Sequence, residues 1–127
     1  MSLAVRIDVD SSTPHYEQLR AQLAALVTAG TLVDGQRLPT VRALANDLGI
    51  APGTVARTYR DLEAAGLVTT RRRVGTLVTA PPATLDRAAV VEAAARFVRI
   101  ARDHGLSDTE IRDLVAAGLL AVPDPAS

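Results

Sequence analysis

The chain has 127 residues with fourteen basic and fourteen acidic side chains, which suits one domain, or one small domain with an appendage, of zero net charge. It has no cysteine and only 2% aromatic residues, which excludes disulfides, thiol catalysis and cysteine-ligated metal sites and argues against an aromatic-lined ligand pocket. No apolar run approaches the ~20 residues of a membrane span and no signal-peptide pattern opens the chain, so we expect a soluble, cytoplasmic protein without membrane contact.

The first predicted elements are a short strand and a helix. Apolar and charged residues alternate over residues 5–10, a pattern that favours a strand. A helix then begins with Thr13 as N-cap and Pro14 at its first position, and its apolar stripe stops before Gly30. Residues 30–39 hold two glycines and one proline, so we expect them to form a loop.

Two short helices joined by a tight turn follow this loop. Thr40 is the predicted N-cap of the first, which ends at Gly49. Pro52 occupies the first position of the second, which ends at Gly66. Two short helices with a glycine at the start of the turn between them are typical of a helix-turn-helix motif.

A β-hairpin is predicted directly after the second of these helices. Residues 67–71 and 76–79 are rich in β-prone side chains, and they flank residues 72–75, which include a glycine suited to a turn. A helix-turn-helix followed by a hairpin makes a winged helix. The expected fold is therefore mainly α with a small β wing.

A proline-rich stretch at residues 80–83 predicts a stiff linker and marks the best domain boundary. We expect a winged helix-turn-helix domain at residues 1–80. Residues 81–127 would then form the linker and a two-helix C-terminal segment.

The C-terminal segment is predicted to contain two helices. The first runs from Leu85 to His104, and the second follows a capping box formed by Ser107 and Glu110. Two helices in about 45 residues cannot bury two apolar faces alone. They must pack on the winged helix or on a second copy of the chain. We favour the second copy, and hence a homodimer, because a self-complementary helix pair suits a twofold interface.

Charge is distributed unevenly along the chain. Residues 36–75 carry seven arginines and three acidic residues, whereas residues 81–127 carry five arginines and seven acidic residues. The local excess of positive charge in the middle of the chain suits a polyanionic partner. We therefore expect residues 1–80 to form a DNA-binding domain.

The second helix of the helix-turn-helix presents small and basic residues opposite its apolar side. These residues are Gly53, Thr54, Arg57 and Arg60. The N-terminus of a helix attracts phosphate, and Gly53 lets the backbone approach DNA closely. Thr54 can contact a phosphate or a thymine methyl, and Arg57 can bind a guanine edge. Taken alone, the same pattern also fits an ordinary solvated helix face.

Three consecutive arginines strengthen the DNA-binding interpretation. Arg71, Arg72 and Arg73 lie at the predicted hairpin tip, in a stretch without acidic residues. There they can neutralise phosphates without sequence preference. Arg42, in the first turn of the first short helix, is a further candidate because that helix usually crosses the DNA backbone.

Motif residues spread over residues 13–79 form a specific pattern. They read Gly30-x-Leu32-x-x-Gly35-x-x-Leu38-Pro39-Thr40-x-Arg42-x-Leu44-Ala45, Leu48-Gly49-Ile50, Thr54-Val55, Tyr59-x-x-Leu62-x-x-x-Gly66-Leu67 and Gly75-Thr76-x-Val78. The pattern resembles the GntR family of bacterial transcription regulators. The opening residues 5–14, the helix start at residues 51–55 and the short two-helix tail resemble its YtrA-like subfamily.

The resemblance implies a homodimer on a palindromic operator, usually a repressor and often one that controls a neighbouring transporter operon. Arg42, Thr54, Arg57 and Gly75 match contact positions of the family, whereas many other branches carry an arginine where Pro52 stands. Together with the residues argued from charge and position, the predicted DNA-binding residues are Thr40, Arg42, Pro52, Gly53, Thr54, Arg57, Arg60, Arg71, Arg72, Arg73 and Gly75.

Two other binding functions stay open. A non-specific architectural DNA-binding protein would lack sequence preference. A winged helix that binds another protein would not need the three wing arginines. The sequence specifies no small-molecule effector, and we expect any inducer at the dimer interface or beside the winged helix.

An enzyme is not expected, and neither is a cofactor or a metal. The only histidines, His15 and His104, lie on different elements without a catalytic pairing pattern. A GntR-like module also heads the MocR-type fusions with a pyridoxal-phosphate fold. The 47 residues after position 80 are too few for that fold, and the chain has no lysine for a Schiff base.

Overall fold

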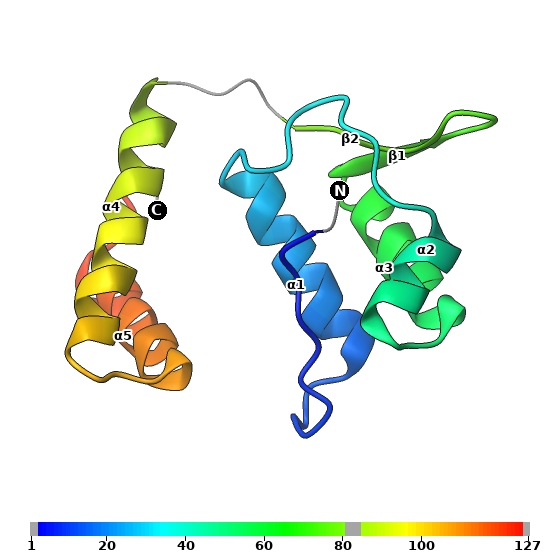
Figure 1. Ribbon diagram of the computed structural model, residues 1–127. Coiled ribbons are helices and arrows are strands. Elements are labelled where there is room, and N and C mark those ends of the chain that lie inside the picture. The colour runs from blue at the N-terminus through cyan, green and yellow to red at the C-terminus, as the bar shows by residue number, and fades with distance from the viewer. Residues whose placement is uncertain (1–2, 81–84, 126–127) are drawn as a thin grey trace. The chain divides into compact units, whose positions relative to one another are not determined.

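The computed structural model describes residues 3–80 and 85–125. The chain forms two compact units, residues 1–83 and 84–127, called here the N-terminal and C-terminal units. The N-terminal unit contains α1 (His15–Thr28), α2 (Val41–Leu48), α3 (Pro52–Ala64), β1 (Val68–Arg71) and β2 (Gly75–Val78), and the C-terminal unit contains α4 (Leu85–Asp103) and α5 (Asp108–Ala121) (Figure 1). The prediction of a mainly α fold with a small β wing is confirmed. The predicted linker falls, from residue 81 onward, outside the described residues.

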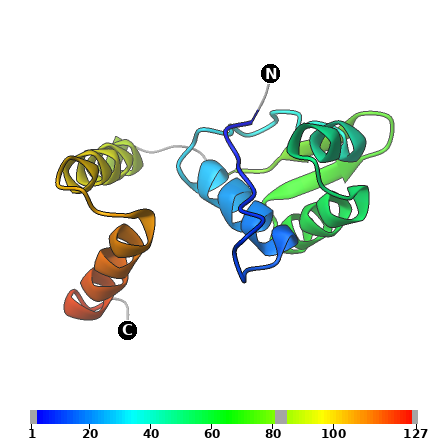
Figure 2. The same ribbon diagram turned by 60° about the horizontal axis from the view of Figure 1, so that its bottom comes forward.

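The strand predicted at residues 5–10 does not form. This segment instead runs along α1 (Figures 1 and 2), whose glutamine side chains take the place of a neighbouring strand. Arg6 N donates to Gln22 Oε1 at 2.8 Å, and Gln22 Nε2 donates to Arg6 O at 2.6 Å. Asp8 and Gln18 exchange the same pair of bonds at 2.8 and 3.0 Å. Because a side-chain amide carries a donor and an acceptor like a peptide group, these two glutamines pair with the segment as a strand would. The alternating pattern indicated extended backbone but not its partner.

Helix α1 begins one residue later than predicted. Pro14 is its N-cap, with an extended ψ of 148°, and no side-chain hydrogen bond caps this helix. The prediction of Thr13 as N-cap is therefore wrong. The Thr13 carbonyl accepts a hydrogen bond from Gln18 Nε2 at 2.8 Å and holds the chain extended up to the proline.

The helix-turn-helix forms as predicted. Thr40 caps α2, with its Oγ1 accepting from Ala43 N at 3.1 Å. Gly49 ends α2 in the left-handed region, at φ 68°. Pro52 opens α3, where a residue without an N–H loses no helical hydrogen bond.

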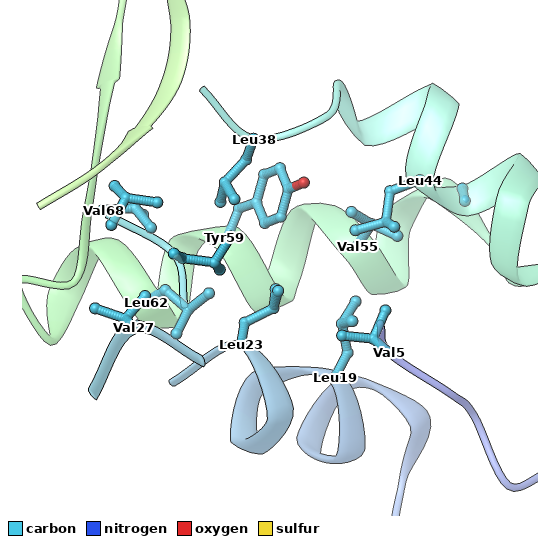
Figure 3. Close-up of a cluster of buried hydrophobic side chains, with 13 residues drawn as sticks. Val5, Leu19, Leu23, Val27, Leu38, Leu44, Val55, Tyr59, Leu62 and Val68 are labelled. Carbon is cyan, nitrogen blue, oxygen red and sulfur yellow. The ribbon is translucent and has the colours of Figure 1, made fainter. Parts of the chain in front are cut away.

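The core of the N-terminal unit lies between α1, α2, α3 and the hairpin (Figure 3). Its completely buried apolar side chains are Leu19, Leu23, Val27, Leu44, Val55, Leu62, Val68 and Val78. Figure 3 shows Leu19 and Leu23 of α1 directed toward the side of α3 that carries Val55 and Leu62. Burial of each such side chain contributes roughly 1.5–3 kcal/mol. The inward side of α3 is thus fixed by packing, and its opposite side faces outward.

The hairpin is antiparallel, with a register that runs from Val68↔Val78 to Arg71↔Gly75. Gly75 belongs to β2, so the turn consists of residues 72–74 and is one residue shorter than predicted. Figure 1 places this turn at the outer edge of the N-terminal unit.

Part of the loop predicted at residues 30–39 pairs with the free edge of β2. Leu38 N donates to Thr76 O at 2.8 Å, and Val78 N donates to Gln36 O at 2.8 Å. Leu38 is buried in the core, which holds this part of the loop against the sheet. The wing is therefore supported on both edges of β2.

The C-terminal unit has the predicted capping box. Ser107 Oγ accepts from Glu110 N, and Glu110 Oε1 accepts from Ser107 N, both at 3.1 Å. The backbone N–H of Ser107, and to a lesser extent its hydroxyl, lower the pKa of the Glu110 carboxyl. Among the described side chains of this unit, Ala101 and Ile111 are buried.

Candidate nucleic-acid interface

The outward side of α3 carries the residues expected there. Gly53, Arg57 and Arg60 are exposed and Thr54 is half-buried. Ala51, the N-cap of α3, gives the first turn no side-chain hydrogen bond. Pro52 has no N–H and Thr54 N donates to Ala51 O at 3.0 Å, so the Gly53 N–H is the donor of this turn left for an acceptor from outside the chain.

Two buried hydroxyls hold α3 to its neighbours. Tyr59 Oη donates to Pro39 O at 2.8 Å, just before α2 begins. Burial raises the pKa of the Tyr59 hydroxyl. Thr58, which is completely buried, donates from Oγ1 to Tyr16 O at 3.0 Å and ties α3 to α1. Thr58 could not be predicted from the sequence, because an isolated threonine on an apolar helix side does not reveal its acceptor.

Arg57 is not simply a solvated side chain. Its guanidinium carbon lies over the ring of Tyr16, at 3.5 Å from the ring centroid. This is a cation–π contact. Tyr16 lies at helical spacing with the buried leucines of α1, but its side chain is only half-buried and supports Arg57.

The wing presents three exposed arginines. Arg71 is the last residue of β1, and Arg72 and Arg73 lie in the turn. Arg73 adopts a positive φ of 68°. One residue before Arg71, Thr70 N donates to Glu63 Oε2 at 2.8 Å and joins β1 to the end of α3.

Arg37 is a further basic residue at the wing that the contact prediction omitted. Its side chain is exposed, and its Nε would lie 3.2 Å from a Cβ atom at Gly75. Gly75 has φ 109° and therefore serves both the backbone conformation and the close approach of Arg37. Arg37 lies at the wing because it pairs with Leu77 of β2. No motif in the sequence predicts that pairing.

Helix α2 adds two of the predicted residues. Arg42 is exposed in its first turn. Thr40 accepts a hydrogen bond from Ala43 N, which leaves its hydroxyl hydrogen free to donate.

The seven arginines of residues 36–75 form no ion pair among the residues that the structure describes. Other arginines do: Arg20 pairs with Glu17, which lowers the pKa of that carboxyl, and Arg99 pairs with Glu92 at 3.2 Å. Of the three acidic residues in this stretch, Glu63 is engaged with the hairpin. The basic charge is therefore not neutralised within the unit.

Other chemistry finds little support in the described residues. No group of three or more acidic, histidine or cysteine residues could hold a metal ion there. Within residues 3–80 and 85–125, no helix is long and apolar enough to cross a bilayer. His15 and His104 belong to different units, and His104, directly after the end of α4, has its Nδ1 2.8 Å from the carbonyl of Ile100 in that helix.

A helix-turn-helix, a paired wing and unneutralised arginines define a winged-helix protein of the nucleic-acid-binding class. The family model of the bacterial regulatory proteins of the gntR family matches residues 15–78. The HTH-type transcriptional regulator Rv1152 of Mycobacterium tuberculosis is 46% identical over 106 residues, which are 84% of this chain and 86% of that protein. The chain belongs to the GntR family, and it is a DNA-binding transcriptional regulator, not an enzyme.

Two similar proteins carry the name YtrA, which confirms the YtrA-like resemblance. The HTH-type transcriptional repressor YtrA of Bacillus subtilis is 40% identical over 75 residues, 59% of this chain and 58% of that protein. The structure of YtrA from Sulfolobus acidocaldarius, a GntR-family transcription factor, has a TM-score of 0.56 at 26% identity. That alignment covers 93% of this chain and 98% of the other.

Proposed function

We propose that this protein is a homodimeric repressor that binds a palindromic DNA operator through residues 1–80 and dimerises through residues 81–127. The observation that carries the proposal is the set of seven arginines on α2, α3 and the wing, which have no ion-pair partner in the described structure. Such a cationic surface binds duplex DNA by releasing counterions from its phosphates. The name of the similar protein from Bacillus subtilis supports repression.

In this proposal, α3 reads the base sequence. Arg57 binds a guanine edge in the major groove and Thr54 contacts a phosphate or a thymine methyl. Pro52 and Gly53 bring the start of the helix close to the groove, where no bulky side chain keeps the backbone away. The buried hydroxyl bonds of Thr58 and Tyr59 support this role because they fix how α3 sits against α1 and α2.

The remaining predicted residues anchor the protein to the DNA backbone. Arg42 and Thr40 at the start of α2, Arg60 on α3, and the wing from Arg71 to Gly75 contact phosphates and fix the register of α3. Arg37, which lies against Gly75, extends this set. Such contacts supply affinity without sequence preference.

The homodimer is supported by the apolar surface of the C-terminal unit. Its exposed apolar side chains are Val90, Ile100, Leu114, Val115, Leu119, Leu120 and Val122. Leu119 and Leu120 are 75% and 88% exposed. A second copy would cover this surface in a twofold interface and would place two α3 helices on two half-sites. A repressor bound to the chromosome would act in the bacterial cytoplasm.

One depression in the described part of the N-terminal unit lies beside the wing. Its volume is about 240 Å³, and it is lined by Asp34, Gly35, Thr69, Arg71, Leu77, Val78 and Thr79. Ligand pockets usually measure about 300–1,000 Å³. The depression is smaller than this range, and we propose that any inducer of this regulator binds at the dimer interface or beside the winged helix.

Selection of bound duplexes from a random DNA library tests the proposed function. We expect enrichment of one site with two inverted half-sites. A variant with Arg71, Arg72 and Arg73 changed to Glu should recover no DNA, and Val33→Glu, an exposed residue of the same unit, is the control for added negative charge. Binding without enrichment would instead indicate an architectural protein, and no recovery by the unaltered chain would favour a protein partner.

A further inference from the structure

We propose that Tyr16 is a positioning residue for DNA recognition: its ring holds the guanidinium of Arg57 in place for a base edge. The inference rests on the proposed function and adds a residue of α1, outside the helix-turn-helix, to the determinants of specificity. It begins from the cation–π contact, with 3.5 Å between the guanidinium carbon of Arg57 and the ring centroid.

The same residue of α1 holds α3 twice. Thr58, the residue after Arg57, donates its hydroxyl hydrogen to the backbone carbonyl of Tyr16 at 3.0 Å. Thr58 is completely buried, so this bond is protected from water. The backbone bond fixes where the Tyr16 ring lies relative to α3, and the ring then fixes where the Arg57 side chain lies.

A stacked ring positions an arginine without occupying its hydrogen-bonding edge. The five N–H donors of a guanidinium lie in its plane and point outward from the edge. A carboxylate partner would bind that edge and compete with a guanine, but Arg57 has no ion pair among the described residues. The ring of Tyr16 covers only a face of the plane, so the edge stays available.

Holding Arg57 in place also reduces the side-chain entropy that is lost when this residue binds a base. A flexible arginine loses rotamer freedom when it binds a base. The Tyr16 ring restricts Arg57 before DNA arrives. Arg60, one turn further along α3, is exposed and has no aromatic ring stacked on it in the described structure. It therefore represents an arginine of the same helix whose side chain no ring restricts.

The test compares Tyr16→Leu and Tyr16→Phe, each alone and combined with Arg57→Ala. The measured quantity is the ratio of affinities for the selected operator and for the operator altered at the base pair whose preference Arg57→Ala relaxes. Tyr16→Leu should lower this ratio about two- to fivefold, the worth of an exposed cation–π contact. Tyr16→Phe keeps the ring and should keep the ratio. In the Arg57→Ala background neither change should lower it further.

Three outcomes would overturn the positioning role of Tyr16 without contradicting the proposed function. Equal loss in both backgrounds would mean that Tyr16 acts without Arg57. Tighter binding by Tyr16→Leu would mean that the ring withholds Arg57 from DNA. Equal ratios for Leu and Phe would mean that the ring is not needed. Thermal unfolding of each variant identifies a loss that comes from misfolding.

Nuclear magnetic resonance of the DNA-free protein separates this proposal from the proposed function. The side-chain protons of Arg57 should show ring-current shifts in the unaltered chain and in Tyr16→Phe, and lose them in Tyr16→Leu. If the shifts are present but the unaltered protein prefers no DNA sequence, the proposed function is wrong, and so is the role of Tyr16 in base recognition. Absent shifts with clear operator preference overturn the positioning role only.

Discussion

Arg57 and Arg72 carry the same charge in different surroundings. Arg57 projects from α3 over an aromatic ring, whereas Arg72 lies in the wing turn. An arginine on a recognition helix can discriminate between bases, but an arginine at a wing tip meets phosphates that are alike in every sequence. The two residues should therefore differ in what they contribute to binding and not merely in how much.

Replacement of each arginine by alanine tests this division. Arg57→Ala should cost about 1–3 kcal/mol on the best operator and relax the preference at one base pair. Arg72→Ala should weaken binding to all sequences alike and reduce the slope of log affinity against log salt by about 1. Fluorescence anisotropy over a panel of operator variants at several salt concentrations measures both. The same profile for the two variants would show that the roles are not divided.

Tyr59 makes the stability of the N-terminal unit depend on pH in a direction that follows from its pKa. Its pKa is raised by burial, so the folded state keeps the phenol proton to higher pH than the unfolded state does. The free energy of unfolding should then fall as the pH rises above about 10, where the unfolded tyrosine ionises. The chain has no lysine or cysteine to obscure this decline.

Urea unfolding between pH 8 and 11, compared with Tyr59→Phe, measures the effect. The variant should be about 0.5–1.5 kcal/mol less stable at pH 8, because it loses the hydrogen bond to Pro39, and its stability should fall less at alkaline pH. Tyr16→Phe is the matched control and should keep the alkaline decline. An equally steep decline in Tyr59→Phe would assign it to other groups.

At the scale of the element, the wing depends on a single glycine. Gly75 pairs with Arg71 at φ 109°, a conformation that strains any other residue, and Arg37 approaches the space that a Cβ atom would fill. Gly75→Ala should therefore lower the free energy of unfolding by about 1–3 kcal/mol. Chemical denaturation monitored by circular dichroism measures the change.

Gly53→Ala is the matched control for the wing. Gly53 lies in the first turn of α3, and a Cβ atom there would meet nothing within 4 Å. Alanine favours the helix over glycine by about 0.5–1 kcal/mol, so this variant should not be destabilised. If both substitutions proved equally harmless, the strain assigned to Gly75 would be wrong.

Elements were predictable wherever local chemistry decides them. Gly49 and Gly66 end helices because they adopt positive φ, and Pro52 opens one. The strand at residues 5–10 was wrong because alternation indicates extended backbone but not what pairs with it. The partners are the side-chain amides of Gln22 and Gln18.

The candidate site was predictable in its residues but not in its contacts. The outward side of α3 follows from helical periodicity, and that prediction named Arg57. The ring of Tyr16 under Arg57 and the guanidinium of Arg37 beside Gly75 join residues about 40 positions apart, through the packing of α1 on α3 and the pairing beside β2. No local pattern in the sequence reports such contacts.

For the whole molecule, the exposed apolar surface of the C-terminal unit predicts self-association. Leu119→Glu and Leu120→Glu change side chains that are largely exposed within one copy, so the unit has no internal reason to unfold. The double variant should sediment as a monomer and should bind the full operator no more tightly than one half-site, because the second contact is no longer tethered. Val33→Glu, 55% exposed in the N-terminal unit, is the control and should leave the sedimentation unchanged. A double variant that remains dimeric would place the interface elsewhere.

Hydroxyl-radical footprinting of the full chain on the selected duplex shows whether two arginine-rich winged helices bind one defined DNA site. We expect a bounded footprint with two equivalent halves, whose centres lie one turn of the duplex apart or a whole number of turns. Protection that spreads along the duplex without boundaries, or a single protected half, would contradict it.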